Sequence, residues 1–515
     1  MKNFVFLCID NKTSYSFEKV FSNKSAFALC LEWVKNIQDC AGAAVFTTKD
    51  KEALVSAELE NAGFKAKVIV KDTWACIDLV KSMAQIMADA KAVNAIYTSA
   101  DKPFIDSALT KEVLDCHEKY IAEYTFAEGY PYGFAPEVIH AGTLNILATL
   151  GTEKFTEEGQ AAVSNECIFN LLKKDVNSFE VEAVLAPKDY RLLRFDFSCG
   201  TKRNFIACQR LYKKAEEKNI PFAAVALSDL AESCADIQQT LPSFYNVQIS
   251  SKLNSVPLYV PEKNFNTENM PLEKFAGLVA QIKDFSDDAV IGLSAFGEPL
   301  LLDNLDAYVA EVLKHENLSV LIETDGTLVT KELAEKISNI SRDRVIWIVS
   351  IDAASAAMYE KIVRGGSFEK AVSSISVLEP LFPKNVYPQL TRINENEDEL
   401  EAFYRYWHDQ NSPSKGKLII QKYDDCCKTL PARKPADLSP LERNVCWHLK
   451  RDMTILADGT VPLCKQFALS SSLGNVFEEG IEKIWNKTLP DVEKHIAGEY
   501  GQKCRDCDEY YTFNF

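Results

Sequence analysis

The sequence predicts an α/β protein that ends in a cysteine-rich module. Short apolar runs alternate with amphipathic helical patterns in two segments, residues 1–150 and 244–424. This alternation is typical of mostly parallel sheets that are covered by helices. The last seventy residues hold four cysteines in polar, turn-rich sequence: Cys446, Cys464, Cys504 and Cys507.

A chain of 515 residues is too long for one hydrophobic core, so we expect several domains. We place the divisions where the strand–helix alternation stops and resumes. The predicted parts are an N-terminal α/β domain (1–150), a connector (151–243), a central β/α domain (244–424) and the cysteine-rich tail (425–515).

Composition and charge narrow the class of protein. The formal net charge is −17 with no basic stripe to offset it, which argues against nucleic acid as a partner. No apolar run reaches the roughly 18 residues of a membrane span, and the first apolar run, broken by Asp10, is interpreted as a strand rather than a secretory signal. The 15 cysteines are mostly isolated within apolar segments, which indicates a reducing, cytoplasmic location without a disulfide framework.

The N-terminal segment contains an acidic residue where open α/β sheets place ligands. Asp101 follows the apolar run 94–99 and precedes Lys102. With the stretch 123–139, this region resembles the nucleotidyltransferase and GT-A-type glycosyltransferase fold, and the resemblance implies a nucleotide-bound divalent metal at Asp101. The turn at 8–21 contains no glycine, however, and such enzymes cradle phosphate there with glycine backbone N–H groups. Asp101 as a cap of the following turn or helix is the alternative.

The central segment predicts a partial (β/α) barrel, with functional side chains at the strand ends. Its strand ends read AFGEPLL, IETDGTLVT and VSIDA, and a further strand ends at Arg392. The order and spacing of these motifs resemble the radical SAM enzymes. The resemblance implies S-adenosylmethionine contacts at the cofactor-binding candidates Gly297, Glu298, Pro299, Ser350, Asp352 and Arg392. Strand-end or capping roles for Glu298 and Asp352 are the alternative.

The first strand of this segment departs from the family pattern. Radical SAM enzymes carry C-x3-C-x2-C after it, and those three positions here are Leu253, Pro257 and Val260, which cannot ligate iron. Two hypotheses follow: the barrel has lost its cluster, or distant cysteines such as Cys426 and Cys427 rebuild the site. A vicinal pair does not easily direct both thiolates at one cluster, so the first hypothesis is favoured.

The tail cysteines have the spacing of a metal site. Cys446 and Cys464 form C-x12-G-x4-C around a turn at Asp458 and Gly459, and Cys504 and Cys507 form CxxC. We expect a hairpin at the turn to bring the first two thiolates together, and the CxxC to supply two more. Four thiolates suit a [4Fe–4S] cluster or zinc, whereas four unrelated buried thiols are the alternative.

The tail also resembles the SPASM domain, through Cys446, DGTVPLC, LGNVFEEGIEKIWN and CRDC. Few residues follow Cys507, which favours a truncated form with one cluster. Cys426 and Cys427 are candidate extra ligands, although YDDCCKT can equally be a surface loop. His448 is a further candidate, but an ordinary histidine is the simpler interpretation.

Taken together, the three parts resemble the spiro-SPASM group of proteins. The predicted function is a [4Fe–4S]-binding, radical-SAM-derived SPASM protein that has lost cleavage of S-adenosylmethionine and acts in binding, scaffolding or electron transfer. One alternative is an enzyme: a radical SAM maturase with rebuilt ligands, or a nucleotidyltransferase. The other is a zinc-stabilised interaction protein. S-adenosylmethionine is a candidate ligand, and a peptide or small molecule is the candidate substrate.

Overall fold

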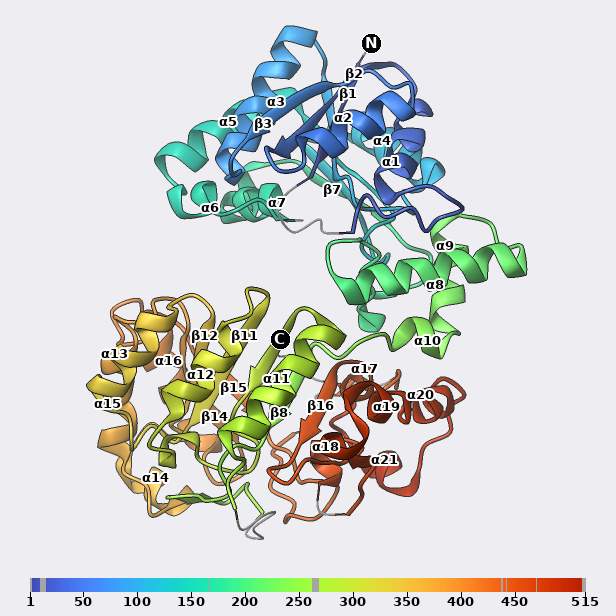
Figure 1. Ribbon diagram of the computed structural model, residues 1–515. Helices are drawn as coiled ribbons and strands as arrows, with labels where there is room; N and C mark the ends of the chain where they lie inside the picture. Colours follow the sequence, from blue (N-terminus) through green and yellow to red (C-terminus); the bar gives the residue numbers. More distant parts are fainter. Residues whose placement is uncertain are drawn as a thin grey trace. The chain divides into compact units, whose positions relative to one another are not determined.

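The computed structural model describes residues 2–9, 15–164, 166–261, 268–436, 439–440, 442–468 and 470–511. The chain divides into two compact units, Met1–Thr240 and Leu241–Phe515 (Figure 1). Part of the glycine-free turn after the first strand, residues 10–14, lies outside the described residues.

The first unit contains a seven-stranded sheet of order β3-β2-β1-β4-β6-β5-β7. Most neighbouring strands are parallel, and β6 alone runs against its two neighbours. The strands are β1 (Asn3–Cys8), β2 (Cys40–Thr48), β3 (Lys67–Lys71), β4 (Asn94–Ser99), β5 (Tyr124–Glu128), β6 (Glu137–His140) and β7 (Val181–Leu185). The predicted mostly parallel sheet is confirmed.

Helices cover both faces of this sheet because its strands are apolar on both sides. In β1, Phe4 and Phe6 belong to one hydrophobic core, whereas Val5 and Leu7 belong to the other. The helices are α1 (Ala26–Lys35), α2 (Glu52–Asn61), α3 (Cys76–Ala90), α4 (Ser107–Tyr120), α5 (Ala141–Glu153), α6 (Thr156–Gln160), α7 (Cys167–Leu172), α8 (Lys202–Lys218), α9 (Ala224–Glu232) and α10 (Ala235–Gln238).

Most of the predicted connector, residues 151–243, lies within the first compact unit. Strand β7 pairs with β5, and α8 contributes Cys208 and Leu211 to a core of the sheet. After α8 the chain forms α9 and α10, with a break at Cys234. The four-part domain division itself stays a prediction.

The second unit contains a seven-stranded, all-parallel sheet of order β15-β14-β12-β11-β10-β8-β16. Its strands are β8 (Phe244–Val247), β10 (Ala289–Gly292), β11 (Leu318–Thr324), β12 (Val345–Ser350), β14 (Val386–Arg392), β15 (Ile419–Lys422) and β16 (Asp452–Ile455). Because β16 comes from the tail, the cysteine-rich segment supplies an edge strand of the barrel sheet.

Helices cover the outer face of this sheet (Figure 1). These are α11 (Leu272–Ser286), α12 (Leu305–Leu313), α13 (Lys331–Ile340), α14 (Ala356–Ile362), α15 (Phe368–Leu378) and α16 (Leu400–His408). Helix α12 packs between α11 and α13, α15 contacts both α13 and α14, and α16 packs against β14. The tail adds α17 (Trp447–Arg451), α18 (Val476–Glu479), α19 (Ile481–Asn486), α20 (Leu489–Ile496) and α21 (Gln502–Asp506). Ile455, Ile484 and Trp485 of the tail belong to the same hydrophobic core as the barrel strands.

The predicted tail hairpin is wrong in its strand pairing. Gly459, with φ +88°, makes the expected turn, and Leu456 N–H donates to Thr460 O at 2.9 Å. The two arms then diverge: β16 pairs in parallel with β8, and β17 (Thr460–Val461) pairs with β18 (Gly474–Asn475). Strand β16 pairs with β8 along Asp452–Ile455, whereas β17 spans only Thr460–Val461, so β8 offers β16 more backbone hydrogen bonds.

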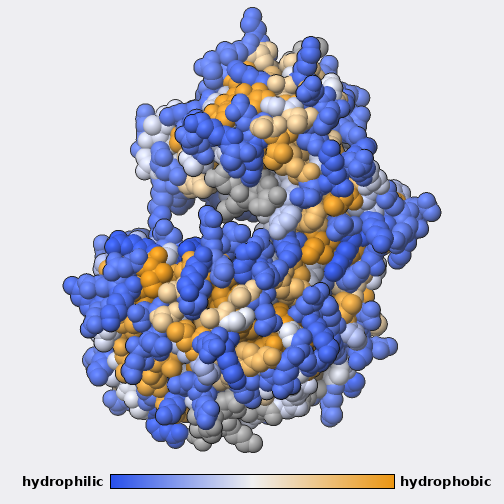
Figure 2. All heavy atoms as spheres, in the orientation of Figure 1, coloured by the Kyte–Doolittle hydropathy of each residue, from blue (hydrophilic) through white to orange (hydrophobic). Residues whose placement is uncertain are grey.

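Hydrophilic side chains cover most of the visible face of each unit, and hydrophobic side chains form separate patches on it (Figure 2). This distribution agrees with the strongly acidic composition of the sequence. Among the described residues, none of the helices combines the length and the apolar character that crossing a membrane requires.

The role of β16 in the second core predicts the effect of a substitution. Ile455 is fully buried, so Ile455→Ala is expected to lower the free energy of unfolding by about 2 to 5 kcal/mol. The matched control is Ile420→Ala, in the edge strand β15 of the same sheet, where the side chain is 39% exposed and the loss is expected to be clearly smaller. Urea unfolding followed by circular dichroism measures both, and equal losses would contradict this placement of β16.

Candidate functional site

The inner face of the second sheet forms a cavity, because side chains alternate between the two faces of each strand. On β8, Tyr245 and Val247 point into the core beneath the helices, whereas Phe244 and Asn246 line the cavity. The same alternation places cavity-lining residues on the other strands: Gly292, Leu321, Glu323, Ile348, Ser350, Gln389, Thr391, Ile419, Gln421 and Thr454.

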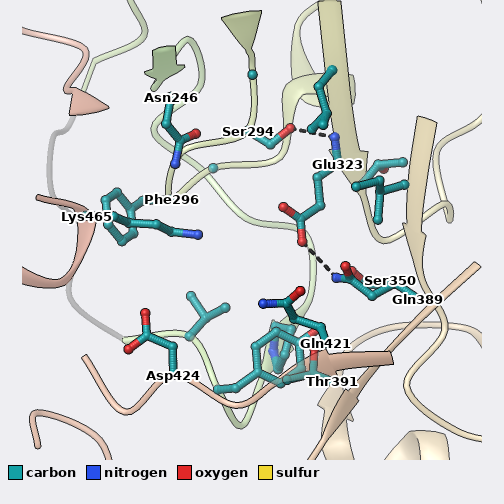
Figure 3. Close-up of a pocket in the computed structure, with 18 of the residues that line it drawn as sticks. Asn246, Ser294, Phe296, Glu323, Ser350, Gln389, Thr391, Gln421, Asp424 and Lys465 are labelled. Carbon is teal, nitrogen blue, oxygen red and sulfur yellow. Dashed lines mark hydrogen bonds between the residues drawn. The ribbon is translucent and has the colours of Figure 1, made fainter. Parts of the chain in front are cut away.

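The cavity has a volume of about 350 Å³ and a mixed polar and apolar lining. Glu323 projects into it from β11 and accepts a hydrogen bond from Gln389 Nε2 at 3.0 Å (Figure 3). Lys465, from the tail, projects into it beside Phe296, with the ammonium 5.9 Å from the ring centroid. The volume is in the range of small-molecule sites, and the lining offers both a carboxylate and an ammonium to a ligand.

The loop that follows β8 forms part of the cavity wall. Leu253, Pro257 and Val260, which occupy the three cluster-ligand positions of the radical SAM pattern, all line the cavity. A short ladder between β9 (Val256–Pro257) and β13 (Val363–Arg364) fixes the middle of this loop. The wall that carries cysteines in the family pattern therefore carries apolar side chains here.

Two buried carboxylates hold this loop in place. Asp325 Oδ2 accepts hydrogen bonds from Asn254 Nδ2 at 2.7 Å and from the Ser255 hydroxyl at 2.6 Å. Asp352 Oδ2 accepts from the Tyr259 hydroxyl at 2.5 Å. Hydrogen bonds to ionised acceptors are among the stronger ones in proteins, so the loop is fixed from the ends of β11 and β12.

Asp352 also ties the loop to the next strand. Its Oδ1 accepts from Thr391 N–H at 2.7 Å, and its backbone has φ +56°, which aspartate tolerates better than most residues. Burial raises the pKa of Asp352 to about 6, while the hydrogen bonds from Tyr259 and Thr391 act in the opposite direction. Ser355, rather than Asp352, caps α14.

Glu298 and Gly297 occupy a tightly packed corner of the cavity. Glu298 accepts from the backbone N–H of Leu300 at 3.0 Å and of Asp325 at 3.1 Å, and from the Thr324 hydroxyl at 2.9 Å. Burial raises its pKa to about 8, and the charge of Asp325 acts in the same direction. A Cβ on Gly297 would lie 1.9 Å from Ser250 O, so only glycine fits there.

The structure brings only some of the predicted cofactor-binding residues to the cavity. Gly297, Glu298 and Ser350 line it, whereas Pro299 starts a turn at Pro299–Leu301 and Arg392 pairs with Glu397, with Nε to Oε2 at 2.8 Å. Their roles as cofactor contacts stay a prediction.

Sequence reasoning missed Glu323, Lys465 and Asp424, which also line the cavity. Glu323 could have been found from the sequence, because it is an isolated acidic residue within an apolar strand.

The tail thiols lie within electrostatic reach of one another. Burial raises the pKa of Cys464, and the charges of Cys446, Cys507 and Cys504 act in the same direction. Burial likewise raises the pKa of Cys446 to about 12, with Cys507 and Cys504 adding to the effect. Among the described residues, no three His, Cys, Asp or Glu side chains are already arranged to hold a metal ion.

The donor set nevertheless fits a thiolate-bound metal centre. Thiols with raised pKa values, such as those of Cys446 and Cys464, become stable thiolates when a cation neutralises them. The four predicted ligands Cys446, Cys464, Cys504 and Cys507 would hold such a centre, and this assignment stays a prediction. His448 is engaged elsewhere through Nδ1, 2.5 Å from Asp452 Oδ2, while its Nε2 is buried without a hydrogen-bond partner.

A second polar cluster lies in the first unit, at the end of β4. Asp101 and Lys102 are both buried, and the Ser99 hydroxyl donates to Asp101. Burial lowers the pKa of Lys102, while Asp101, Glu137 and Asp196 act to raise it. The helix cap proposed for Asp101 belongs instead to Asp106, which accepts from Ala108 N–H at 2.7 Å.

Comparison with known families agrees with this geometry. Residues 254–406 match the radical SAM superfamily, and residues 446–508 match SPASM, an iron–sulfur cluster-binding domain. The chain belongs to the radical SAM/SPASM family. Its family domains therefore imply iron–sulfur clusters and S-adenosylmethionine as cofactors.

Several relatives of this radical SAM/SPASM protein are known. An uncharacterised protein of Treponema pallidum is 38% identical over 365 residues, covering 68% of this chain and 98% of the relative. GTP 3′,8-cyclase of Lactiplantibacillus plantarum is 25% identical, covering 50% of this chain and 92% of the relative. The spore coat polysaccharide biosynthesis protein SpsF of Bacillus subtilis is 22% identical, covering 34% of this chain and 68% of the relative.

Solved structures resemble different portions of the radical SAM/SPASM chain. SuiB of Streptococcus suis, bound to the precursor peptide SuiA, matches with a TM-score of 0.43 at 12% identity, covering 70% of this chain and 84% of SuiB. A cytidylyltransferase of Leptospira borgpetersenii matches with a TM-score of 0.38 at 14% identity, covering 46% of this chain and 96% of that enzyme.

The raised pKa of Asp352 predicts a pH dependence. An exposed aspartate has a pKa of roughly 3.9, so between about pH 4 and 6 the folded protein keeps a proton that the unfolded chain releases, and stability falls as the pH rises. Asp352→Asn removes this ionisation and retains hydrogen-bonding groups for Tyr259 and Thr391. The free energy of unfolding of the variant, relative to that of wild type, is expected to rise by about 2 kcal/mol from pH 4.5 to pH 7.5.

Urea unfolding of both proteins at the two pH values measures this difference. Asp115→Asn, at an exposed position of α4, serves as the control and should show the same relative stability at both. A stability difference between Asp352→Asn and wild type that does not change with pH would show that Asp352 is not a titrating constraint on the loop.

Proposed function

We propose that this protein binds a [4Fe–4S] cluster through its tail, does not cleave S-adenosylmethionine, and acts in binding, scaffolding or electron transfer. One observation carries the loss of cleavage: Leu253, Pro257 and Val260 occupy the cluster-ligand positions in the cavity wall. Apolar side chains offer no donor to iron, so the residues there do not fit the radical SAM cluster.

The residues that line the cavity do not support a cluster rebuilt from distant cysteines. Among the described residues that line it, Cys426 is the one cysteine, and three thiolates are needed to leave an open iron for S-adenosylmethionine. The loop is held instead by hydrogen bonds to Asp325 and Asp352.

The cavity itself remains suited to a ligand. Its volume, the carboxylate of Glu323, the ammonium of Lys465 and the hydroxyl of Ser350 support a small polar molecule with charges of both signs. S-adenosylmethionine is one such molecule, and a peptide is the other class that the family resemblance implies.

The tail centre would supply electron transfer or a structural cross-link. A cluster with four cysteine ligands has no open iron, so it would not act as a Lewis acid. Zinc on the same four thiols is the alternative, and it would leave a stabilised interaction module without redox chemistry.

Metal analysis of the anaerobically purified protein tests this proposal. We expect about four iron and four sulfide per chain, lost in the Cys504→Ala, Cys507→Ala double variant and retained in Cys116→Ala, a half-buried cysteine of α4. With reductant and S-adenosylmethionine, the protein is expected to release no 5′-deoxyadenosine. One zinc without iron would contradict the redox role, and about eight iron with 5′-deoxyadenosine would contradict the loss of cleavage.

A nucleotidyltransferase activity of the first unit is the second candidate. Its support is the buried pair Asp101 and Lys102 after β4, with the half-buried Asp196 close enough to Lys102 to interact with its charge, together with the similarity to a polysaccharide biosynthesis protein. Two carboxylates and a lysine are suitable partners for a divalent cation and the phosphates that it carries.

Equilibrium dialysis of CTP with Mn²⁺ tests this second candidate. Asp101→Asn is expected to weaken binding at least about tenfold, a loss near 1.4 kcal/mol, because the carboxylate charge that faces the cation is removed. Asp115→Asn, on the exposed face of α4, should bind as wild type does. If wild type and Asp101→Asn bind equally, or neither binds, the first unit does not use this cluster for nucleotides.

A further inference from the structure

Several charged side chains that line the barrel cavity are already neutralised by another residue of its wall. Asp452 pairs with Arg451. Lys422 pairs with Glu509, with Nζ 3.2 Å from Oε1. A ligand would have to break these pairs in order to use their charges, so they do not define the chemistry of the ligand.

Three further carboxylates of the lining are occupied by hydrogen bonds. Both oxygens of Glu298 accept from the wall, and Asp325 holds the loop that follows β8. Asp424 accepts from Gln466 Nε2 at 3.0 Å and from Cys426 N–H at 2.8 Å. Each of these carboxylates therefore stabilises the wall itself.

Glu323 and Lys465 differ from this set, because neither forms an ion pair with any of the described residues. Glu323 Oε1 accepts from Gln389 Nε2 at 3.0 Å, and Glu323 N–H donates to Ser294 Oγ at 2.8 Å. These two contacts hold the residue in place from β14 and from the end of β10. Among the described residues, Glu323 Oε2 has no hydrogen-bond donor, so it is available to a ligand.

The two charged groups face the same space. Figure 3 shows the carboxylate of Glu323 and the ammonium of Lys465 both directed into the cavity, the first from β11 and the second from the tail. Apolar side chains also line the cavity: Phe244, Leu321, Ile348 and Ile419. A charge in such a partly apolar site interacts more strongly with an opposite charge than it does in bulk water.

We propose that the cavity binds a zwitterion of the α-amino-acid type, with its ammonium on Glu323 and its carboxylate on Lys465. The apolar lining would receive an apolar side chain of this ligand. The inference rests on the proposed ligand-binding role of the cavity and names the class of ligand. Glu298 takes no part in this recognition, because its oxygens already accept hydrogen bonds from the wall.

Isothermal titration calorimetry of the anaerobically purified, full-length protein tests the inference. Wild type is titrated with L-leucine, L-methionine and L-phenylalanine, and we expect at least one Kd below about 1 mM. The tightest of the three is then compared with its N-acetyl derivative, which lacks the ammonium, and with its amide, which lacks the carboxylate. Each derivative is expected to bind about tenfold more weakly or worse.

Two variants assign each charge of the ligand to its partner. In Glu323→Gln, the amino acid and its N-acetyl derivative are expected to bind with equal affinity. In Lys465→Met, the amino acid and its amide are expected to do so. Glu401→Gln, in α16 with its side chain 74% exposed, is the control and should retain the wild-type preferences.

Two results would overturn the inference. One is no binding of the three amino acids by wild type, and the other is a preference for either charge that persists in its matched variant. Iron and sulfide are quantified in the same preparation and report on the tail centre independently. Failure of amino-acid binding in an iron-loaded protein would therefore leave the proposed tail cluster in place, whereas an iron-free wild type would contradict that cluster and not this inference.

Discussion

The parallel pairing of β16 with β8 is the constraint on which the second unit depends. Asp452 to Ile455 align with Phe244 to Val247, so the tail extends the barrel sheet rather than folding by itself. Cys446 lies six residues before Asp452, and Cys464 lies nine residues after Ile455. The same ladder therefore fixes the first cysteine pair and brings Lys465 to the mouth of the barrel cavity.

The loop after β8 shows how the barrel mouth stays ordered without cysteines. Cross-linking by three metal–sulfur bonds would reduce the conformational freedom of such a loop, and hydrogen bonds to buried carboxylates can do the same. Asp325 holds Asn254 and Ser255, while Asp352 holds Tyr259. Burial makes ionisation of Asp352 costly, whereas the hydrogen bonds from Tyr259 and Thr391 favour the ionised form. Burial is the larger effect, so the fold as a whole is more stable where that carboxyl keeps its proton.

The sequence was sufficient for local structure and insufficient for the pairing of distant segments. Strand β12 was predicted from VIWIVSID because a continuous apolar run between helices indicates a buried parallel strand. The pairing of β16 was missed because the two sides of the turn at Gly459 carry similar apolar runs, MTIL (453–456) and VPL (461–463). Their proximity in sequence favoured a hairpin. Lys465 was missed for the same reason, since a tail residue reaches the cavity only through that pairing.

The different surroundings of the vicinal cysteines could not be predicted from their spacing in the sequence. Sequence alone left Cys426 and Cys427, in the segment after β15, as equivalent candidates, whereas in the structure Cys426 lines the cavity and Cys427 lies within electrostatic reach of Cys507 and Cys464. A cluster in the barrel would need three thiolates on one side of that segment, and the segment supplies one. On either side of the vicinal pair, Asp424 accepts a hydrogen bond from Gln466 and Lys428 pairs with Asp506, so the segment contacts residues next to both cysteine pairs of the tail. Moving this segment into the barrel would require both of these contacts to rearrange.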